Sequence, residues 1–164
     1  MSPAGVLVPL VERENGLALL LTRRARQLKH HAGQVSFPGG RMEAADRSIV
    51  DTALRETWEE VGVPPTDVQV VGYLPTMPTV TGYAVTPVVG IYDQYTRLVL
   101  DQMEVERAFE VPLDFLMTPG NERWSTRKVG NTRVPLAEFR YTGERIWGAT
   151  AAMILALREK LISK

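Results

Sequence analysis

The chain has 164 residues, of which 45% are hydrophobic and 23% are charged, an ordinary globular composition that is sufficient to bury a core. Nineteen basic residues balance nineteen acidic ones, so no net charge favours nucleic acid or an anionic membrane as a partner. The absence of cysteine excludes disulfides, thiolate metal sites and a cysteine nucleophile. No apolar run is long enough for a signal peptide or a membrane span, and no linker divides the chain. We therefore expect a single cytoplasmic domain over residues 1–164.

The N-terminal part of the chain predicts a β-hairpin. Residues 5–11 and 17–22 are apolar, and the polar turn 12–16 separates them. Pro9 cannot donate a ladder hydrogen bond, so we expect it at a sheet edge or a bulge.

A basic segment follows this hairpin. Arg23, Arg24, Arg26 and Lys29 lie close together and are followed by two histidines. A basic cluster alone is usually a solvated loop, and adjacent histidines in a polar segment are usually exposed, so we assign the histidines no metal role. We interpret the basic residues as a grip for anions, because they lead directly into a Pro-Gly-Gly turn where the backbone can approach a ligand closely.

An amphipathic helix is predicted after the glycine turn. Ser48 begins it as a candidate N-cap, and Gly62, followed by two prolines, ends it. Glu56, Glu59 and Glu60 stand at i, i+3 and i+4, so their carboxylates share one face. A hard divalent cation prefers carboxylate oxygens and would relieve their mutual repulsion. The apolar stripe of this helix is expected to comprise Ile49, Val50, Ala53, Leu54, Thr57 and Val61.

The rest of the chain predicts two strands, a hairpin and a closing helix. We expect these elements at residues 67–74, 83–92, 123–130 with 133–141, and 146–161. The loop 75–82 between the two strands is rich in Pro and Gly, and it is either a rim of the active site or a simple connector.

The glycine turn, the Arg-Glu and Glu-Glu pairs and the terminal glycine together resemble the Nudix hydrolase box. In this chain the box begins at Gly40, has its early acid at Asp46, and ends with residues 55–63. Asp46 stands where the family has Glu, one extra residue precedes the Arg-Glu pair, and Thr57 replaces an aliphatic residue. The resemblance implies an α/β (α+β) fold, the Nudix α/β/α sandwich, with a mixed β-sheet between helices.

The first two departures resemble the coenzyme A pyrophosphatase branch of this family. The upstream sequence matches that branch at residues 20–25, at Gly33 and at residues 37–40, whereas Lys29 replaces an Arg. Lysine keeps the charge but loses the bidentate fork. The resemblance implies metal-dependent hydrolysis of the pyrophosphate bond of coenzyme A or acyl-CoA, which gives 4′-phosphopantetheine and 3′,5′-ADP.

The same resemblance implies the metal and the acidic residues of the site. Mg²⁺ or Mn²⁺ would be held by Glu56, Glu59 and Glu60, and the last two are also candidate catalytic groups. Arg55 is placed to orient Glu59 across one turn of the helix. A further carboxylate is needed as general base or to hold the water, and we choose Glu104 over its neighbour Glu106; the alternative is that Glu104 is an ordinary surface residue.

The candidate substrate-binding residues are Arg23, Arg24, Lys29, Gly39 and Gly40. The three cations would grip phosphates, and the glycines would bring the backbone close to the substrate. Trp58 is expected to pack against the protein rather than stack on a base.

Two alternatives to coenzyme A hydrolysis stay open. The first is a Nudix hydrolase acting on ADP-ribose, NADH or a nucleoside triphosphate. The second is a non-catalytic Nudix domain that binds a nucleotide; such a domain could lose its box carboxylates, yet all three glutamates are present, which favours an enzyme. A homodimer is also open, because dimers are frequent in the wider family.

Overall fold

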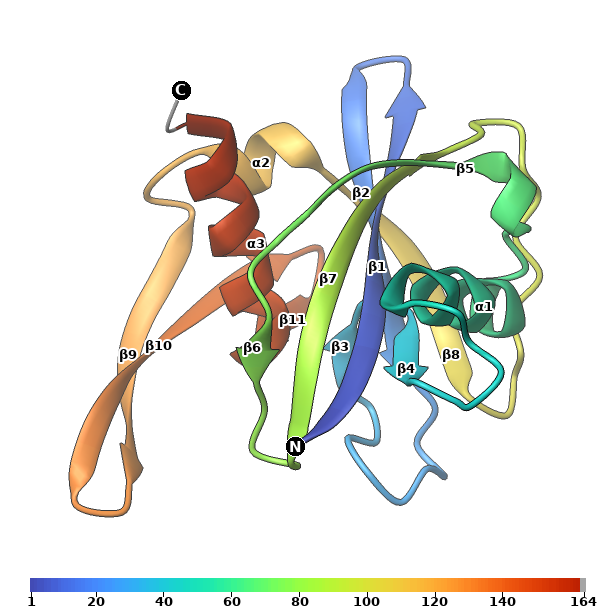
Figure 1. The fold of residues 1–164 in the computed structure, drawn as a ribbon. Coiled ribbons are helices and arrows are strands. Elements are labelled where there is room, and N and C mark those ends of the chain that lie inside the picture. The colour runs from blue at the N-terminus through green and yellow to red at the C-terminus, as the bar shows by residue number, and fades with distance from the viewer. Residues whose placement is uncertain (163–164) are drawn as a thin grey trace.

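The computed structural model describes residues 1–162, and its largest element is an eight-stranded mixed sheet (Figure 1). Its strand order is β3-β2-β1-β7-β5, while β4 pairs with β1, β6 with β7 and β8 with β2. Strands β1 and β7 are parallel, and the other pairs are antiparallel. The strands are β1 (Ser2–Arg13), β2 (Gly16–Arg24), β3 (Val35–Ser36), β4 (Gly39–Arg41), β5 (Val68–Tyr73), β6 (Met77–Pro78), β7 (Tyr83–Tyr92) and β8 (Val105–Pro112).

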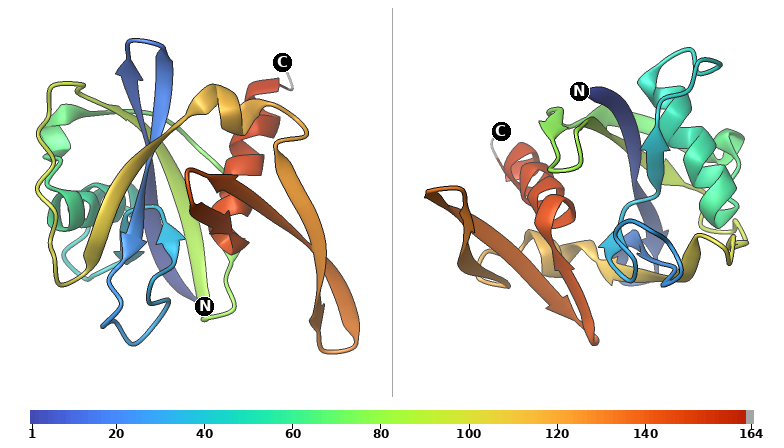
Figure 2. Two further views of the ribbon diagram at one scale, coloured as in Figure 1. Left: turned by 180° about the vertical axis from the view of Figure 1, so that it is seen from behind. Right: turned by 90° about the horizontal axis from the view of Figure 1, so that it is seen from below.

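A second, three-stranded antiparallel sheet and the helices complete the fold. This sheet has the order β11-β10-β9, and the end of its β9–β10 hairpin projects from the body of the molecule (Figures 1 and 2). Helices α1 and α3 lie on opposite sides of the main sheet (Figure 1). The expected α+β architecture with a mixed sheet between helices is therefore confirmed. The elements are β9 (Glu122–Val129), β10 (Thr132–Tyr141), β11 (Glu144–Trp147), α1 (Ile49–Val61), the 3₁₀ helix η1 (Pro65–Asp67), α2 (Leu113–Met117) and α3 (Gly148–Ile162).

Strand β2 divides the core into two faces, because successive side chains of a strand point to opposite sides. Leu19 and Leu21 belong to the large hydrophobic cluster that includes Ile154 of α3. Leu20 belongs instead to the cluster that includes Val61 of α1. Odd-numbered residues of β2 therefore face α3, and even-numbered residues face α1.

The prediction that Pro9 marks a sheet edge or a bulge is wrong, because β1 is a central strand and its ladder with β7 continues through Pro9 without a register shift. Pro9 lies between the part of β1 paired with β4, which ends at Val6, and the part paired with β2, which begins at Leu10. The nitrogen of Leu7, two residues earlier, donates to the carbonyl of Pro38 at 2.9 Å. Since backbone groups two residues apart face the same side, the nitrogen of Pro9 faces the gap between these ladders, where no N–H is required.

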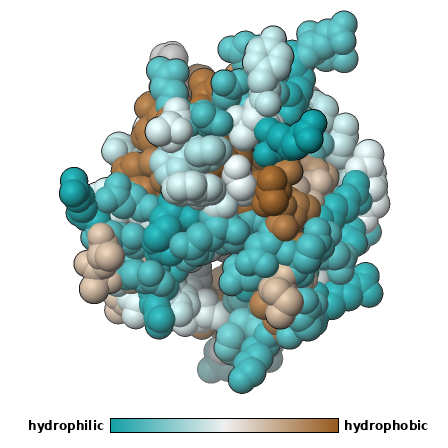
Figure 3. All heavy atoms as spheres, turned by 90° about the vertical axis from the view of Figure 1, so that its right-hand side faces the viewer, coloured by the Kyte–Doolittle hydropathy of each residue, from teal (hydrophilic) through white to brown (hydrophobic). Residues whose placement is uncertain are grey.

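Helix α1 begins and ends as its sequence predicts. The Ser48 side chain accepts from the Asp51 amide at 3.3 Å, and Gly62 ends the helix in the left-handed conformation at φ 77°. Thr57, which replaces an aliphatic residue, is buried and donates its hydroxyl to the Ala53 carbonyl at 2.7 Å. The packing role expected for Trp58 is wrong, because this side chain is 56% exposed. The protein face on the side of α1 is largely hydrophilic, with hydrophobic groups scattered over it (Figure 3).

Candidate active site

Three glutamates form an acidic cluster beside α1. Glu56 and Glu60 project from the helix, and Glu104 comes from the segment that precedes β8; one carboxylate oxygen of each lies within 4.8 Å of the other two. Glu104 is held in place because its carbonyl accepts the Ala25 amide at 2.8 Å, which ties the segment to the end of β2. Glu60 is buried, Glu56 half-buried and Glu104 exposed, so the cluster leads from the interior to solvent.

The glycine turn lies directly against these carboxylates. The Gly39 amide donates to Glu60 Oε2 at 3.2 Å. A Cβ on Gly40 would lie 2.5 Å from Glu56 Oε2, and a Cβ on Gly39 would overlap the carbonyl of Gly5. The position of Gly39 therefore requires glycine, because its neighbour is backbone, whereas the neighbour of Gly40 is the end of a side chain. The close approach of these glycines to a substrate stays a prediction.

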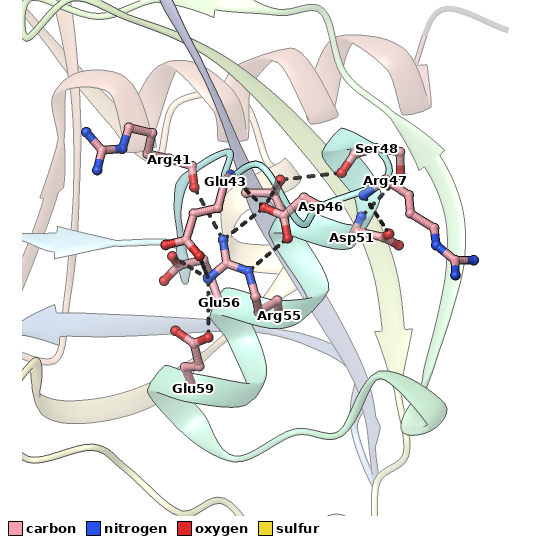
Figure 4. A network of polar contacts seen from close by, with 10 residues as sticks. Arg41, Glu43, Asp46, Arg47, Ser48, Asp51, Arg55, Glu56 and Glu59 are labelled. Carbon is pink, nitrogen blue, oxygen red and sulfur yellow. Dashed lines mark hydrogen bonds and ion pairs between the residues drawn. The ribbon is translucent and has the colours of Figure 1, made fainter.

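Arg55 connects the start of the box to its glutamates (Figure 4). Its Nε and Nη2 donate to the two carboxylate oxygens of Asp46 at 2.9 and 3.0 Å. Its Nη1 donates to Glu56 and to Glu59 at 3.2 Å each. Hydrogen bonding by Arg55 holds the pKa of the Asp46 carboxyl well below its usual range, and the Asp46 partner in turn raises the pKa of Arg55. Arg55 thus orients Glu59, as expected, and also Glu56.

Glu59 lies outside the cluster that the other three glutamates form. Its side chain is 57% exposed, and its carboxylate is held by Arg55. Its assignments as metal ligand and catalytic group remain predictions. Glu106 is engaged by Arg23 at 3.0 Å and by Arg26 at 3.3 Å, and the choice of Glu104 over Glu106 as general base stays a prediction.

The cluster carries a strong electrostatic bias toward a proton or a cation. Burial, reinforced by the charge of Glu56, raises the pKa of Glu60 to about 9. Burial also raises the pKa of Glu56, although Arg55 opposes this. In the metal-free protein Glu60 therefore keeps a proton at neutral pH. The donor set consists of carboxylate oxygens, which suits Mg²⁺ or Mn²⁺, so the residues present fit the cation that the resemblance implies.

Arg23 and Arg24, two members of the predicted anion-binding cluster, lie on opposite faces of strand β2. Arg24 lies on the α1 face, where its charge lowers the pKa of Glu60, and within residues 1–162 its buried Nε has no hydrogen-bond partner. Arg23 lies on the opposite face, where its guanidinium binds the buried Glu144 at 3.2 and 2.5 Å. The structure therefore brings Arg24 to the acidic cluster and separates Arg23 from it. Lys29 lies exposed in the loop that follows β2.

Two of these interactions are not predicted by any local sequence pattern. Glu144 is 2% exposed and also accepts from Arg107 at 2.7 Å, yet it stands in a polar stretch that carries no pattern typical of a buried ion pair. The bidentate contact of Asp46 with Arg55 joins residues nine apart across a loop, and only the position of Asp46 within the box suggested that it mattered.

A mixed sheet lies between helices, and the glycine turn and the acidic face of α1 lie beside one another. The NUDIX domain family matches residues 1–144, and the chain belongs to the Nudix family. Nudix hydrolases act on phosphoric anhydrides of nucleoside diphosphate derivatives, and this chain is a pyrophosphohydrolase of that class. Within residues 1–162, no helix combines the length and apolarity that crossing a membrane would require.

Relatives and solved structures agree with this family. A protein of Pectobacterium atrosepticum named uncharacterized Nudix hydrolase NudL is 47% identical over 153 residues, which are 92% of this chain and 78% of the relative. A NudL of Citrobacter koseri is 41% identical and covers 94% and 80%. Two crystal structures share the fold. RenU, a Nudix hydrolase from M. smegmatis, has a TM-score of 0.60 at 22% identity and covers 70% of this chain and 72% of its own. The NUDIX domain of Shewanella oneidensis NrtR, complexed with ADP ribose, has a TM-score of 0.60 at 18% identity. The match covers 98% of this chain and 88% of the NrtR chain.

Proposed function

We propose that this enzyme hydrolyses the pyrophosphate bond of coenzyme A or acyl-CoA, giving 4′-phosphopantetheine and 3′,5′-ADP. The observation that carries the proposal is the position of the upstream signature. Its Arg24 faces the acidic cluster with a buried Nε that has no partner within residues 1–162, and its Gly39 and Gly40 contact Glu60 and Glu56. The residues that resemble the coenzyme A branch thus adjoin the groups proposed for catalysis.

The metal ligands that we propose are Glu56 and Glu60, with Glu59 as a further candidate and Glu104 beside them. A bound Mg²⁺ or Mn²⁺ would neutralise charge on the phosphate oxygens and make a water more acidic. Arg55 fixes the carboxylates of Glu56 and Glu59, so their orientation does not depend on the ligand.

The proton-accepting group that we propose is Glu104. It is the exposed member of the cluster, so its carboxylate is reachable by a water that enters with the substrate. Arg24 would bind the diphosphate from the α1 face, and Lys29 would bind a more distant phosphate from its exposed loop. We do not propose Arg23 as a phosphate-binding residue at this site, because Glu144 and Glu106 already engage its guanidinium.

The test is a substrate panel with product identification by mass. Coenzyme A, acetyl-CoA, ADP-ribose, NADH and nucleoside triphosphates are compared with Mg²⁺ and with Mn²⁺. We expect coenzyme A or its thioester to give the highest kcat/KM, with 3′,5′-ADP as a product. Negligible turnover of coenzyme A beside rapid cleavage of another compound would overturn the assignment and favour the first alternative, and reaction in ¹⁸O water would locate the attacked phosphorus.

The non-catalytic alternative is separated from this proposal by the same panel. A protein that binds a nucleotide and cleaves nothing, with either metal, would be a binding domain. We further propose a cytoplasmic location, which rests on the cysteine-free sequence, and a homodimer, which rests on family resemblance and is tested by light scattering.

A further inference from the structure

A cleft of about 510 Å³ lies on the face of the main sheet opposite the acidic cluster. The loop that follows β2 forms one wall, and the β10–β11 turn with β11 forms the other; Figure 2 shows these segments beside one another in the view from below. The cleft is open to solvent and is lined mainly by polar side chains. The lining residues used below are Arg23, Arg26, Gln34, Glu144, Arg145 and Trp147.

The cleft is separate from the acidic cluster. Arg23 lines it and faces α3, whereas the adjacent Arg24 faces α1 and Glu60. Strand β2 stands between the two sites, paired with β8 on one side and with β3 on the other. A group bound in the cleft therefore does not compete for the carboxylates that we propose as metal ligands.

One wall of the cleft carries the Arg145 guanidinium over the Trp147 ring, and we call this pair the Arg145–Trp147 platform. The Arg145 guanidinium lies 4.6 Å from the centroid of the half-buried Trp147 ring. The Arg145 Nε also donates to Glu138 at 2.7 Å, which fixes the plane of the guanidinium. A guanidinium and an indole held in this way are the kind of surface on which a nucleobase stacks.

The facing wall supplies positive charge. Arg26 is 78% exposed and contacts Glu106 through one nitrogen, Nε, at 3.3 Å, so its other nitrogens face solvent. Arg23 is held rigidly by the buried Glu144 at the floor, and the Gln34 amide borders the cleft. A guanidinium with accessible nitrogens opposite an aromatic platform suits a phosphate attached to a base through a sugar.

We propose that this cleft binds a nucleoside phosphate, with the base on the Arg145–Trp147 platform and a phosphate at Arg26. The source is either the nucleotide half of the substrate or a free nucleotide. Binding at the cleft does not require the coenzyme A assignment to be correct, because the probe described next is tested without turnover.

The test is metal-free binding of 3′,5′-ADP in the presence of EDTA. Trp58 and Trp124, both more than half exposed, are changed to Phe, so that Trp147 becomes the fluorescent reporter. We expect saturable quenching, with the dissociation constant raised roughly tenfold or more by R145A and by R26A. The matched control is R133A, on the projecting hairpin, where Arg133 contacts Thr126. Adenosine and inorganic phosphate, each offering half of the ligand, are expected to bind more weakly.

The proposal is overturned if 3′,5′-ADP causes no saturable quenching while melting curves show a folded protein. It is also overturned if R145A and R133A bind equally well. Given binding, kinetics with the best substrate of the panel separate the two sources. A raised KM at unchanged kcat in R145A identifies the nucleotide half of the substrate, and unchanged kinetic constants identify a free nucleotide.

Discussion

Arg55 binds Asp46 through two parallel hydrogen bonds of 2.9 and 3.0 Å, and the same guanidinium reaches Glu56. Asp46 is thus the partner of Arg55 at the position where the general box has Glu. Asp46 also accepts the Glu43 amide and the Thr52 hydroxyl at 2.9 Å each, so it fixes the loop before α1 as well as the arginine. Arg55 therefore connects the loop at the start of the box to the acidic cluster through hydrogen bonds.

Replacing Asp46 with Asn should weaken metal binding without removing any proposed ligand. The amide cannot accept both donors of Arg55, so Glu56 loses its orientation, and the affinity for Mn²⁺ should fall roughly tenfold. Calorimetric titration measures this. The matched control is E43Q, because Glu43 is 60% exposed and lies 3.8 Å from Arg55. Equal affinities in the two variants would contradict the positioning role of Asp46.

Replacing Glu60 with Gln should reduce kcat by at least about 100-fold while preserving the fold, since Gln has the shape of the protonated acid that the metal-free protein holds. E104Q should also lose activity. Steady-state kinetics and melting curves check both variants, with E159Q on the exposed side of α3 as control. A comparison with E59Q tests the remaining assignment: if Glu59 contributes as a ligand, its loss reduces kcat as well, and full activity of E59Q would remove Glu59 from the site.

Metal binding at neutral pH should release a proton from Glu60. Burial raises the pKa of this carboxyl to about 9, so the metal-free protein is protonated there at pH 7, and the cation must displace that proton. Calorimetry in two buffers of different ionisation enthalpy should report close to one proton per ion for the unchanged protein and none for E60Q. Equal proton release by both proteins would place the titrating group elsewhere.

The stability of the metal-free protein should fall as pH rises. The folded protein keeps the Glu60 proton up to about pH 9, whereas the unfolded chain loses it near its ordinary pKa of 4.5. The stabilisation of the folded protein that results from the Glu60 proton is therefore complete below pH 4.5, and it is lost as the pH approaches 9. Between pH 5 and pH 8.5 in EDTA, the melting temperature should drop by at least roughly 3 °C more than that of E60Q, which corresponds to about 1 kcal/mol. Parallel curves for the two proteins would contradict this prediction.

The two glycines of the turn should respond differently to alanine. In G39A the new methyl group meets the Gly5 backbone, which cannot move aside. The free energy of unfolding should therefore fall by about 1–3 kcal/mol. In G40A the methyl group meets the end of the Glu56 side chain, which can shift at the cost of its hydrogen bond with Arg55, so the melting temperature should change less while metal affinity falls. Denaturant unfolding and metal titration of both variants test this, and the reverse order of stabilities would be inconsistent with the structure.

Local patterns predicted much of the fold and part of the site. The cap at Ser48, the stop at Gly62 and the strand at residues 83–92 depend on local signals, and all three are confirmed. The position of Pro9 depends on where two ladders diverge, which no local pattern encodes. Strand β11 was not predicted, because its four residues carry too little alternation. The spacing of Glu56 and Glu60 predicts that they share one helix face. The separation of Arg23 from Arg24 depends on the position of β2 between two hydrophobic clusters, which only the structure shows.

The most direct test of the central claim is a manganese anomalous map from crystals grown or soaked with Mn²⁺. We expect an ion among Glu56, Glu60 and Glu104, with oxygen ligands, and a lower occupancy of that site in E60Q at the same Mn²⁺ concentration. A well-ordered site with no manganese among these three carboxylates, at concentrations that support turnover, would contradict it.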